Sequence, residues 1–402
     1  MPAAATGCHD LVVIHLAGGN DYLNTVVPYD DGRYHDARPG LGLHPGRELP
    51  PLRLPGRAEE LPPGPSVVPL DERVGLHGAH GTFHRLYDAG RLAVFLGIGY
   101  PDRDRSHFRS LDIWHTADPV APRDVGWLGR AAARLDPGHE EPVLLVNVGR
   151  ALPLAMAAPG VLAASLESVD SYGIFPDARG DAGGHRRLSA AVRSFYGPDP
   201  LPGPWSTAQA VGAAALAGID ALGAVGRAEP AEPLCYPAFS PIAERLRVIA
   251  DIKAAGVGSR VFFTAHDGYD THENQLPVQR RLFAELSEAL AAFLADLDRR
   301  VPGHRTAVLI FSEFGRRIAE NRGGTDHGGA GVAFLVGDHV RGGLYGDYPD
   351  LAADRQIDGD LRPAVDFRAL YTSVLEQFVG VEADAVLDRP RRGLDLLAAG
   401  AR

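Results

Sequence analysis

The sequence predicts an α/β protein with a central, largely parallel sheet and helices on both faces. Short apolar, β-branched segments alternate along the chain with longer segments of helical periodicity, which is the pattern of a parallel sheet with crossover helices. Several apolar segments are followed at once by Asp, Glu or His. Because the carboxyl ends of parallel strands meet at one edge, where open α/β sheets bind ligands, we expect a polar site at that edge.

The secondary structure of the first half of the chain can be predicted from the sequence except in one stretch. Residues 29–69, rich in Pro, Gly, Arg and Asp, predict a long excursion with little regular structure, and such long loops are often functional. Apolar periodicity and flanking turn residues predict the remaining elements: strands at 11–16, 91–99 and 142–148, and helices at 81–89, 107–116 and 129–135.

The second half is clear after a mixed middle region. Residues 151–237 combine an Ala-rich helical stretch at 207–218 with Gly/Pro-rich loops at 180–184 and 198–204. Beyond them the periodicity predicts helices at 241–255, 277–300 and 366–379, and strands at 260–265, 306–311 and 332–337. We therefore expect one domain over residues 1–402, with loop-rich insertions near 30–70 and 151–240.

The composition excludes several classes of protein. A net charge of -11 argues against a nucleic-acid binder. With only Cys8 and Cys235, a disulfide framework or a Cys-rich zinc site is not expected, so any metal must be held by His and carboxylates. No apolar run predicts a membrane span, and residues 1–10 lack the regions of a signal peptide. We expect no membrane partner and a cytoplasmic location, or export if a signal has been removed.

The first polar cluster is Gly18–Asn24, directly after the first strand. Its two glycines allow a sharp turn and a close approach to a ligand. Asp21 would supply a hard oxygen donor, and Asn24 a second oxygen or an amide that faces an anion. The alternative, equally supported by this motif, is a turn whose Asp caps the next helix.

The second cluster is at the start of the helix predicted at 107–116. Ser106 is either its N-cap, which base rates favour, or a nucleophile at an anion site made by the free N–H groups of the helix. Arg103, Arg105, His107 and Arg109 crowd the same turn. They suit a phosphate or sulfate ligand, or form a solvated basic turn.

The segment His266–His272 is more specific. Two carboxylates and two imidazoles lie within seven residues, just past a strand. Asp270 and His272, two residues apart in an extended or turning segment, face the same side. Carboxylates and imidazoles that converge in this way are typical of a divalent metal site.

The last strand ends supply the remaining candidates. Glu313 leaves an apolar strand and needs a metal or a partner, for which Arg316 or Arg317 is the alternative. Asp326 and His327 lie between glycines, which allow the backbone to approach a metal. The chain contains no nucleophile elbow, dinucleotide fingerprint or Walker motif.

Taken together, these motifs resemble the bacterial family called domain of unknown function 1501, which is sulfatase-like and belongs to the alkaline phosphatase superfamily. The similarity runs from about residue 10 to 380 in order. It is carried by residues 16–29 (LAGGNDYLNTVVPY), 105–108 (RSHF), 126–130 (GWLGR), 268–275 (GYDTHENQ), 312–317 (SEFGRR) and 324–328 (GTDHG).

The resemblance implies an alkaline-phosphatase-like three-layer sandwich that binds one or two divalent metal ions (Zn, Mn, Mg or Ca) and a small anionic substrate. By position it assigns Asp21 and Glu313 to one metal. It assigns Asp270, His272 and His327 to the other, with Asp326 beside them.

It also makes Ser106 the candidate nucleophile, surrounded by Asn24, Arg105 and His107, with Arg109 and Arg316 as further substrate-binding residues.

The chain departs from the superfamily in two places. Phe314 stands where a histidine ligand is usual, so one well-made metal site is the safer expectation than two. No Cys-x-Pro-x-Arg motif occurs, which excludes a formylglycine sulfatase. We expect a metal-dependent hydrolase or transferase of phosphate- or sulfate-type esters. The alternatives are a biosynthetic metalloenzyme that does non-hydrolytic chemistry on a specialised metabolite, and a non-catalytic binding protein.

Overall fold

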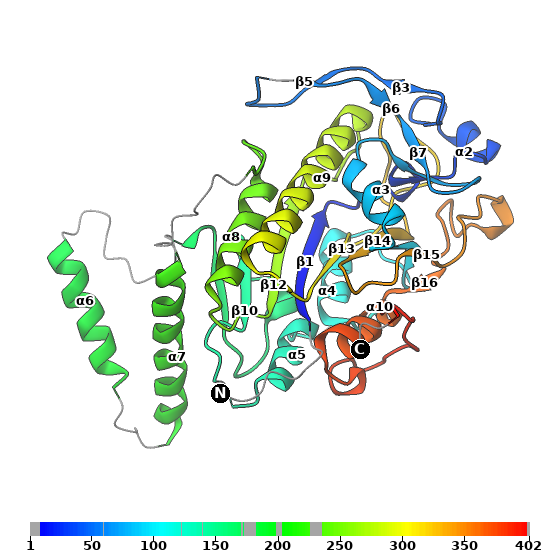
Figure 1. The fold of residues 1–402 in the computed structure, drawn as a ribbon. Coiled ribbons are helices and arrows are strands. Elements are labelled where there is room, and N and C mark those ends of the chain that lie inside the picture. Colours follow the sequence, from blue (N-terminus) through cyan, green and yellow to red (C-terminus); the bar gives the residue numbers. More distant parts are fainter. Residues whose placement is uncertain are drawn as a thin grey trace.

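A nine-stranded sheet forms the centre of the protein (Figure 1). The computed structural model describes residues 9–58, 60–121, 123–138, 140–169, 172, 182–197, 203–225 and 235–399. The strand order is β11-β10-β12-β1-β13-β14-β9-β15, and β16 also pairs with β9. The strands are β1 (Asp10–Ala17), β9 (Leu92–Gly99), β10 (Leu145–Val148), β11 (Ala163–Leu166), β12 (Val261–Asp267), β13 (Thr306–Phe311), β14 (Gly331–Val336), β15 (Gly343–Tyr345) and β16 (Val365–Asp366).

All neighbouring strands run parallel except at β14, which is antiparallel to both β13 and β9. The predicted α/β class with a largely parallel sheet is therefore confirmed. The reversed direction of β14 was not predicted. It arises because residues 312–330 between β13 and β14 contain no crossover helix, so the chain returns along the neighbouring position of the sheet.

Helices cover both faces of the sheet and enclose two cores. Because strand side chains alternate, Val12 and Ile14 of β1 belong to the core under α3 (Gly81–Asp88), α8 (Pro241–Ala255) and α9 (Gln275–Arg300). Leu11 and Val13 belong to the opposite core, under α4 (His107–Thr116), α5 (Trp127–Leu135) and α10 (Phe367–Ser373), which continues as a π-helical turn (Val374–Val379). Strands buried on both faces explain the continuous apolar runs in the sequence.

Local signals place the ends of these helices. In α8, the Ser240 hydroxyl accepts a hydrogen bond from the backbone N–H of Ala243, and Pro241 occupies the first turn, where no N–H is needed. The helix ends at Gly256, whose φ of 64° is left-handed. Helix α4 begins at His107, as predicted, so Ser106 occupies its N-cap position.

The excursion at 29–69 has more regular structure than predicted. Short antiparallel pairs join its segments, and the part around β3 to β6 lies beside helix α9, whose Arg280 donates to the carbonyls of Pro50 and Pro62 (Figure 1). The elements from 22 to 77 are α1 (Tyr22–Thr25), β2 (Val26–Val27), α2 (Gly32–Ala37), β3 (Glu48–Leu49), β4 (Leu52–Arg53), β5 (Glu60–Leu61), β6 (Gly64–Pro65), β7 (Val67–Pro69) and β8 (Gly75–His77).

The middle region forms two helices, α6 (Ala182–Phe195) and α7 (Pro204–Val225), beside the sheet (Figure 1). One 18-residue window of α7, Ala208–Val225, is long and apolar enough to cross a membrane by length and composition, and 22% of it is buried. The expectation that no run reaches this threshold was wrong, because alanines and glycines make a long, weakly apolar stretch with Asp220 as its one charge. Of the predicted loops, 198–202 and part of 180–184 lie outside the described residues.

Candidate metal centre

Four segments bring polar side chains to the carboxyl edge of the sheet. Asp270 lies three residues beyond β12, and Glu313 lies two residues beyond β13. His327 precedes β14, which starts at this edge because it runs in the reverse direction. His107 opens α4 after β9. The parallel strands therefore gather residues that are more than two hundred positions apart in the chain.

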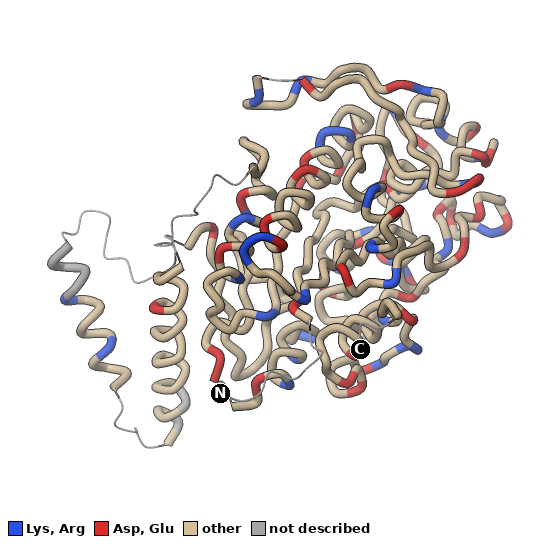
Figure 2. Tube along the Cα trace, viewed as in Figure 1, with Lys and Arg blue, Asp and Glu red and all other residues tan. Residues whose placement is uncertain are grey.

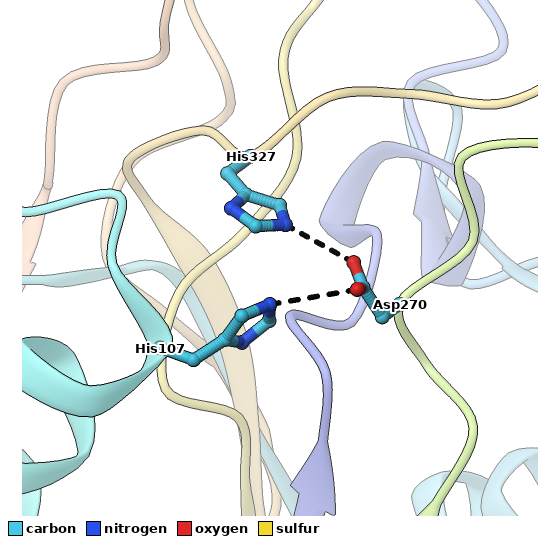
Figure 3. Close-up of side chains that lie close together, drawn as sticks. All are labelled: His107, Asp270 and His327. Carbon is cyan, nitrogen blue, oxygen red and sulfur yellow. Dashed lines mark hydrogen bonds and ion pairs between the residues drawn. The ribbon is translucent and has the colours of Figure 1, made fainter.

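Three of these side chains, His107, Asp270 and His327, form a cluster (Figure 3). Their candidate ligand atoms all lie within 4.8 Å of one another. Nε2 of His327 is 3.0 Å from Oδ1 of Asp270, and Nε2 of His107 is 3.6 Å from Oδ2. Nδ1 of His272 lies 3.1 Å from the same Oδ1, so a fourth donor borders the group.

The outer nitrogens of both imidazoles are fixed by acceptors. Nδ1 of His327 lies 2.8 Å from the carbonyl oxygen of Arg105, and Nδ1 of His107 lies 2.8 Å from Oε1 of Glu313. Since these oxygens accept, each Nδ1 carries the proton. Each Nε2 faces Asp270: a protonated ring pairs with that carboxylate through Nε2–H, and a neutral ring presents a lone pair there. A divalent cation in place of the two Nε2 protons would be bound by both lone pairs and by the carboxylate, and this arrangement of outer acceptors is typical of metal-bound histidines.

Glu313 is almost completely buried and is bound from four sides. Its oxygens accept from His107, His15, the backbone N–H of Gly18 and the Ser312 hydroxyl, at 2.8 to 3.0 Å. Burial alone would raise the pKa of Glu313, but the charge of His15 and the hydrogen bonds from the two histidines hold it well below its usual range. Glu313 is therefore an anion that orients His107.

The pKa values of the cluster follow the same contacts. The hydrogen bond to Glu313 raises the pKa of His107, against the opposing effect of burial. Partial burial would raise the pKa of Asp270, but hydrogen bonds from Arg316 and His327 lower it. Asp270 is thus ionised at neutral pH. Its side chain is 48% exposed to solvent, which leaves one side open to a ligand.

Glycines make the close packing beneath the cluster possible. A Cβ on Gly18 would lie 2.3 Å from the backbone nitrogen of Asp270. A Cβ on Gly19 would lie 2.2 Å from the ring of Phe314, and both glycines have positive φ. The Phe314 ring, in turn, lies 4.8 Å from the His107 and His327 rings, measured between centroids. Phe314 therefore forms an apolar floor under the two imidazoles.

The structure does not bring Asp21 and Asn24 to this cluster. The carboxylate of Asp21 is fully buried, and it accepts hydrogen bonds from Arg38, Gln275 and the N–H of Leu23. The Asn24 side chain is likewise buried, bound to Arg38 and to two further groups of the 34–41 segment. Both predicted roles are disfavoured, because Arg38 already balances the charge of Asp21 and occupies its oxygens.

Two arginines that were predicted to bind substrate or to take part in catalysis instead hold the site together. Arg316 is buried and donates to the carbonyls of four residues (Gly18, Gly19, Tyr269 and Thr325) and to Oδ1 of Asp270 at 2.7 Å. It joins three site loops and has no free face for a substrate. Arg105 forms an ion pair with Asp360 at 2.8 Å, and its carbonyl orients His327.

The remaining predicted residues lie at the rim. Ser106 is exposed, and among the described residues its hydroxyl makes no capping hydrogen bond, so the N-cap position does not use the side chain. Arg109 is half-buried on the first turn of α4. Asp326 is exposed and accepts a hydrogen bond from the side chain of Asn321 at 2.6 Å, away from the three clustered residues.

The sequence analysis missed His15 and Arg38. His15 contacts Glu313 through Nε2 at 3.0 Å, and the available signal was a histidine inside an otherwise apolar strand segment. Arg38 lies in the excursion at 29–69, where nothing in its neighbourhood marks it as the partner of a residue seventeen positions earlier.

Residues 217–386 match the model of the family described as "Protein of unknown function (DUF1501)". The resemblance to this family is thereby confirmed over that segment, which contains Asp270, Glu313 and His327. No curated protein matches the chain.

Several solved structures are similar to this chain at low identity. Ps i-CgsB is 12% identical, with 95% of this chain and 75% of that chain covered and a TM-score of 0.40. A 2-O GAG sulfatase is 11% identical, with coverages of 84% and 65% and a TM-score of 0.32. A putative sulfatase from Bacteroides thetaiotaomicron VPI-5482 is 14% identical, with coverages of 84% and 66% and a TM-score of 0.31.

Proposed function

We propose that this protein is a metal-dependent hydrolase or transferase of phosphate- or sulfate-type esters, with an alkaline-phosphatase-like site at the carboxyl edge of its sheet. The observation that carries the proposal is the pair of imidazoles whose Nδ1 protons are fixed by Glu313 and by the Arg105 carbonyl. Both Nε2 atoms face Asp270. Two imidazoles and one carboxylate suit Zn²⁺ or a similar transition metal better than Ca²⁺.

One ion fits the residues better than two. Both oxygens of Glu313 already accept hydrogen bonds, and the carboxylate of Asp21 is bound to Arg38. The Phe314 ring fills the space beneath the imidazoles. The divalent ion is therefore assigned to His107, Asp270 and His327, with His272 as an additional donor at the open side. A metal bound there would polarise the ester and lower the pKa of an attacking hydroxyl or water.

The residues around the cluster would bind and orient the ester. Ser106 is exposed beside His107, and its hydroxyl is the candidate nucleophile. The first N–H groups of α4 and the positive end of its dipole attract an oxyanion at the same place. Arg105 is paired with Asp360 but remains partly exposed, so it adds positive charge at the rim. These features favour a small anionic substrate.

Metal analysis and an ester assay test the proposal together. We expect about one equivalent of divalent metal on the purified protein after loading, and turnover of aryl phosphates or aryl sulfates that chelation abolishes. Asp270→Asn should lose both. Asp267→Asn is the matched control, since this exposed carboxylate three residues earlier pairs with Arg245 outside the cluster.

The outcomes separate the parts of the proposal. Failure of the wild-type protein to bind any divalent metal would overturn the site itself. Stoichiometric metal without turnover of either ester class would reject the proposed reaction and favour non-hydrolytic chemistry at the same centre.

A further inference from the structure

The α6–α7 hairpin stands at the side of the protein, beyond α8 (Figure 1). Helix α7 packs on the body through Leu216, Leu222 and Val225, which are buried. Helix α6 contacts α7: a Cβ on Gly212 would lie 2.1 Å from the Tyr196 ring, and Arg193 pairs with Asp220 at 2.6 Å. The hairpin is thus a defined unit that presents the outer face of α6 to its surroundings.

That outer face is apolar. Leu188, Ala191 and Phe195 are exposed at positions i, i+3 and i+7 of α6, which lie along one stripe of a helix. Phe195 is 69% exposed, and Trp205, at the other side of the connection between the helices, is 64% exposed. With Val211, the hairpin carries four of the eight exposed large hydrophobic side chains in the described part of the chain. Such concentration marks an interaction surface.

The charge of the hairpin is opposite to that of the protein. The described side chains of helix α6 include Arg187 and Arg193 and no acidic residue, and α7 contains only Asp220, whereas the whole chain has a net charge of -11. In Figure 2 the described parts of the two helices show little acidic colour, beside a body where both signs are mixed. An apolar stripe bordered by arginines is typical of helices that lie in the surface of an anionic bilayer.

We propose that the α6–α7 hairpin docks this protein on an anionic lipid surface, with Leu188, Phe195 and Trp205 entering the interfacial layer. Aromatic side chains favour that layer, and the excess of positive over negative charge in the two helices attracts acidic headgroups. Helix α7 lies along the surface and does not cross it, because its inner face packs on the protein. A second copy of the chain is a poorer partner, since a two-fold contact through α6 would bring its arginines together.

Vesicle binding tests the proposal without reference to the ester reaction. Trp205 is a built-in reporter because Trp114 and Trp127, the other two tryptophans, are buried. We expect a blue shift of tryptophan emission and co-sedimentation with phosphatidylcholine vesicles containing phosphatidylglycerol, at low salt. Both should weaken with pure phosphatidylcholine and at high salt.

Substitution at the stripe locates the contact. Leu188→Glu combined with Phe195→Glu should weaken vesicle partitioning by at least about tenfold, with unchanged metal content and thermal stability, because both side chains are exposed. Val120→Glu, at a residue 58% exposed outside the hairpin, should leave binding intact. The proposal is overturned if the wild-type protein ignores acidic vesicles, if the double variant binds them normally, or if that variant instead dissociates a dimer seen by light scattering.

Discussion

Replacing Glu313 by Gln should weaken metal binding through His107. The carboxylate accepts from four donors (His107, His15, Ser312 Oγ and the Gly18 N–H). An amide of the same shape has one acceptor oxygen, so two of these donors lose their partner. Each charge-assisted hydrogen bond contributes about 1.5–3 kcal/mol, so we expect unfolding free energy to fall by about 3–6 kcal/mol.

The loss of orientation has a second, separable effect. Without an anion at Nδ1, the His107 ring is free to turn or to carry its proton on the other nitrogen, and loss of such partners lowers metal affinity by about 10–100-fold. Calorimetric titration of the metal-free protein with Zn²⁺ or Mn²⁺ measures this effect, and urea unfolding measures the first.

Glu285→Gln is the matched control. Glu285 is a buried carboxylate on α9 that contacts His266 of β12 and Arg281, one turn earlier on the same helix, outside the metal cluster. We expect this variant to lose stability and keep its metal affinity. If Glu313→Gln binds metal as tightly as the wild type, or if both variants lose affinity equally, Glu313 does not act by orienting His107.

Three further predictions follow from packing and protonation. Arg38→Met leaves the buried charge of Asp21 unpaired and should cost about 3–5 kcal/mol in urea unfolding; adding Asp21→Asn should restore part of that loss, and strict additivity of the two changes would contradict the pairing. Gly19→Ala should be clearly more destabilising in thermal unfolding than Gly90→Ala, since both have positive φ but only Gly19 lacks room for a Cβ; equal losses would remove the argument from close packing. Burial lowers the pKa of His115 to about 3 in the folded protein, whereas in the unfolded chain it is about 6.5. Between these values the unfolded chain binds a proton that the folded protein does not, so the unfolding free energy falls as the pH falls below about 6.5. At pH 5.5 the loss is about 1.4 kcal/mol, and His115→Leu should reduce the difference in unfolding free energy between pH 7.5 and 5.5 by that amount. An unchanged difference would mean that the imidazole is protonated in the folded protein.

The elements that build the sheet could be predicted closely from the sequence. The strand at 306–311 and the helices at 107–116 and 241–255 have the predicted bounds, because apolar periodicity and capping residues act over a few positions. The placement of Asp270 and Glu313 at one edge follows from the direction of parallel strands, which alternation with helices already indicates. The placement of His327 at the same edge depends on the reversed strand β14 and could not be predicted in this way.

The part of the site that depends on long-range partners could not be predicted. Asp21 has the motif of a metal ligand, but its environment is decided by Arg38, which arrives from an irregular excursion. Glu313 was expected to bind a metal directly, and instead its oxygens hold two histidines. A carboxylate that binds a cation and one that orients a neighbouring imidazole have the same sequence pattern, since the difference lies in a third side chain.

Because β14 is antiparallel to β13, one local connection, residues 312–330, carries part of the metal centre. Strand β13 ends and β14 begins at the same edge of the sheet, so both ends of the connection 312–330 lie next to each other there. The N–H of Gly328 donates a hydrogen bond to the carbonyl of Gly315 at 2.9 Å. Glu313, Phe314 and His327 are therefore all part of one hairpin whose ends are fixed by the sheet. Insertions or exchanges within that hairpin can alter the donor set and its floor at once, without moving a crossover helix or changing the order of the sheet.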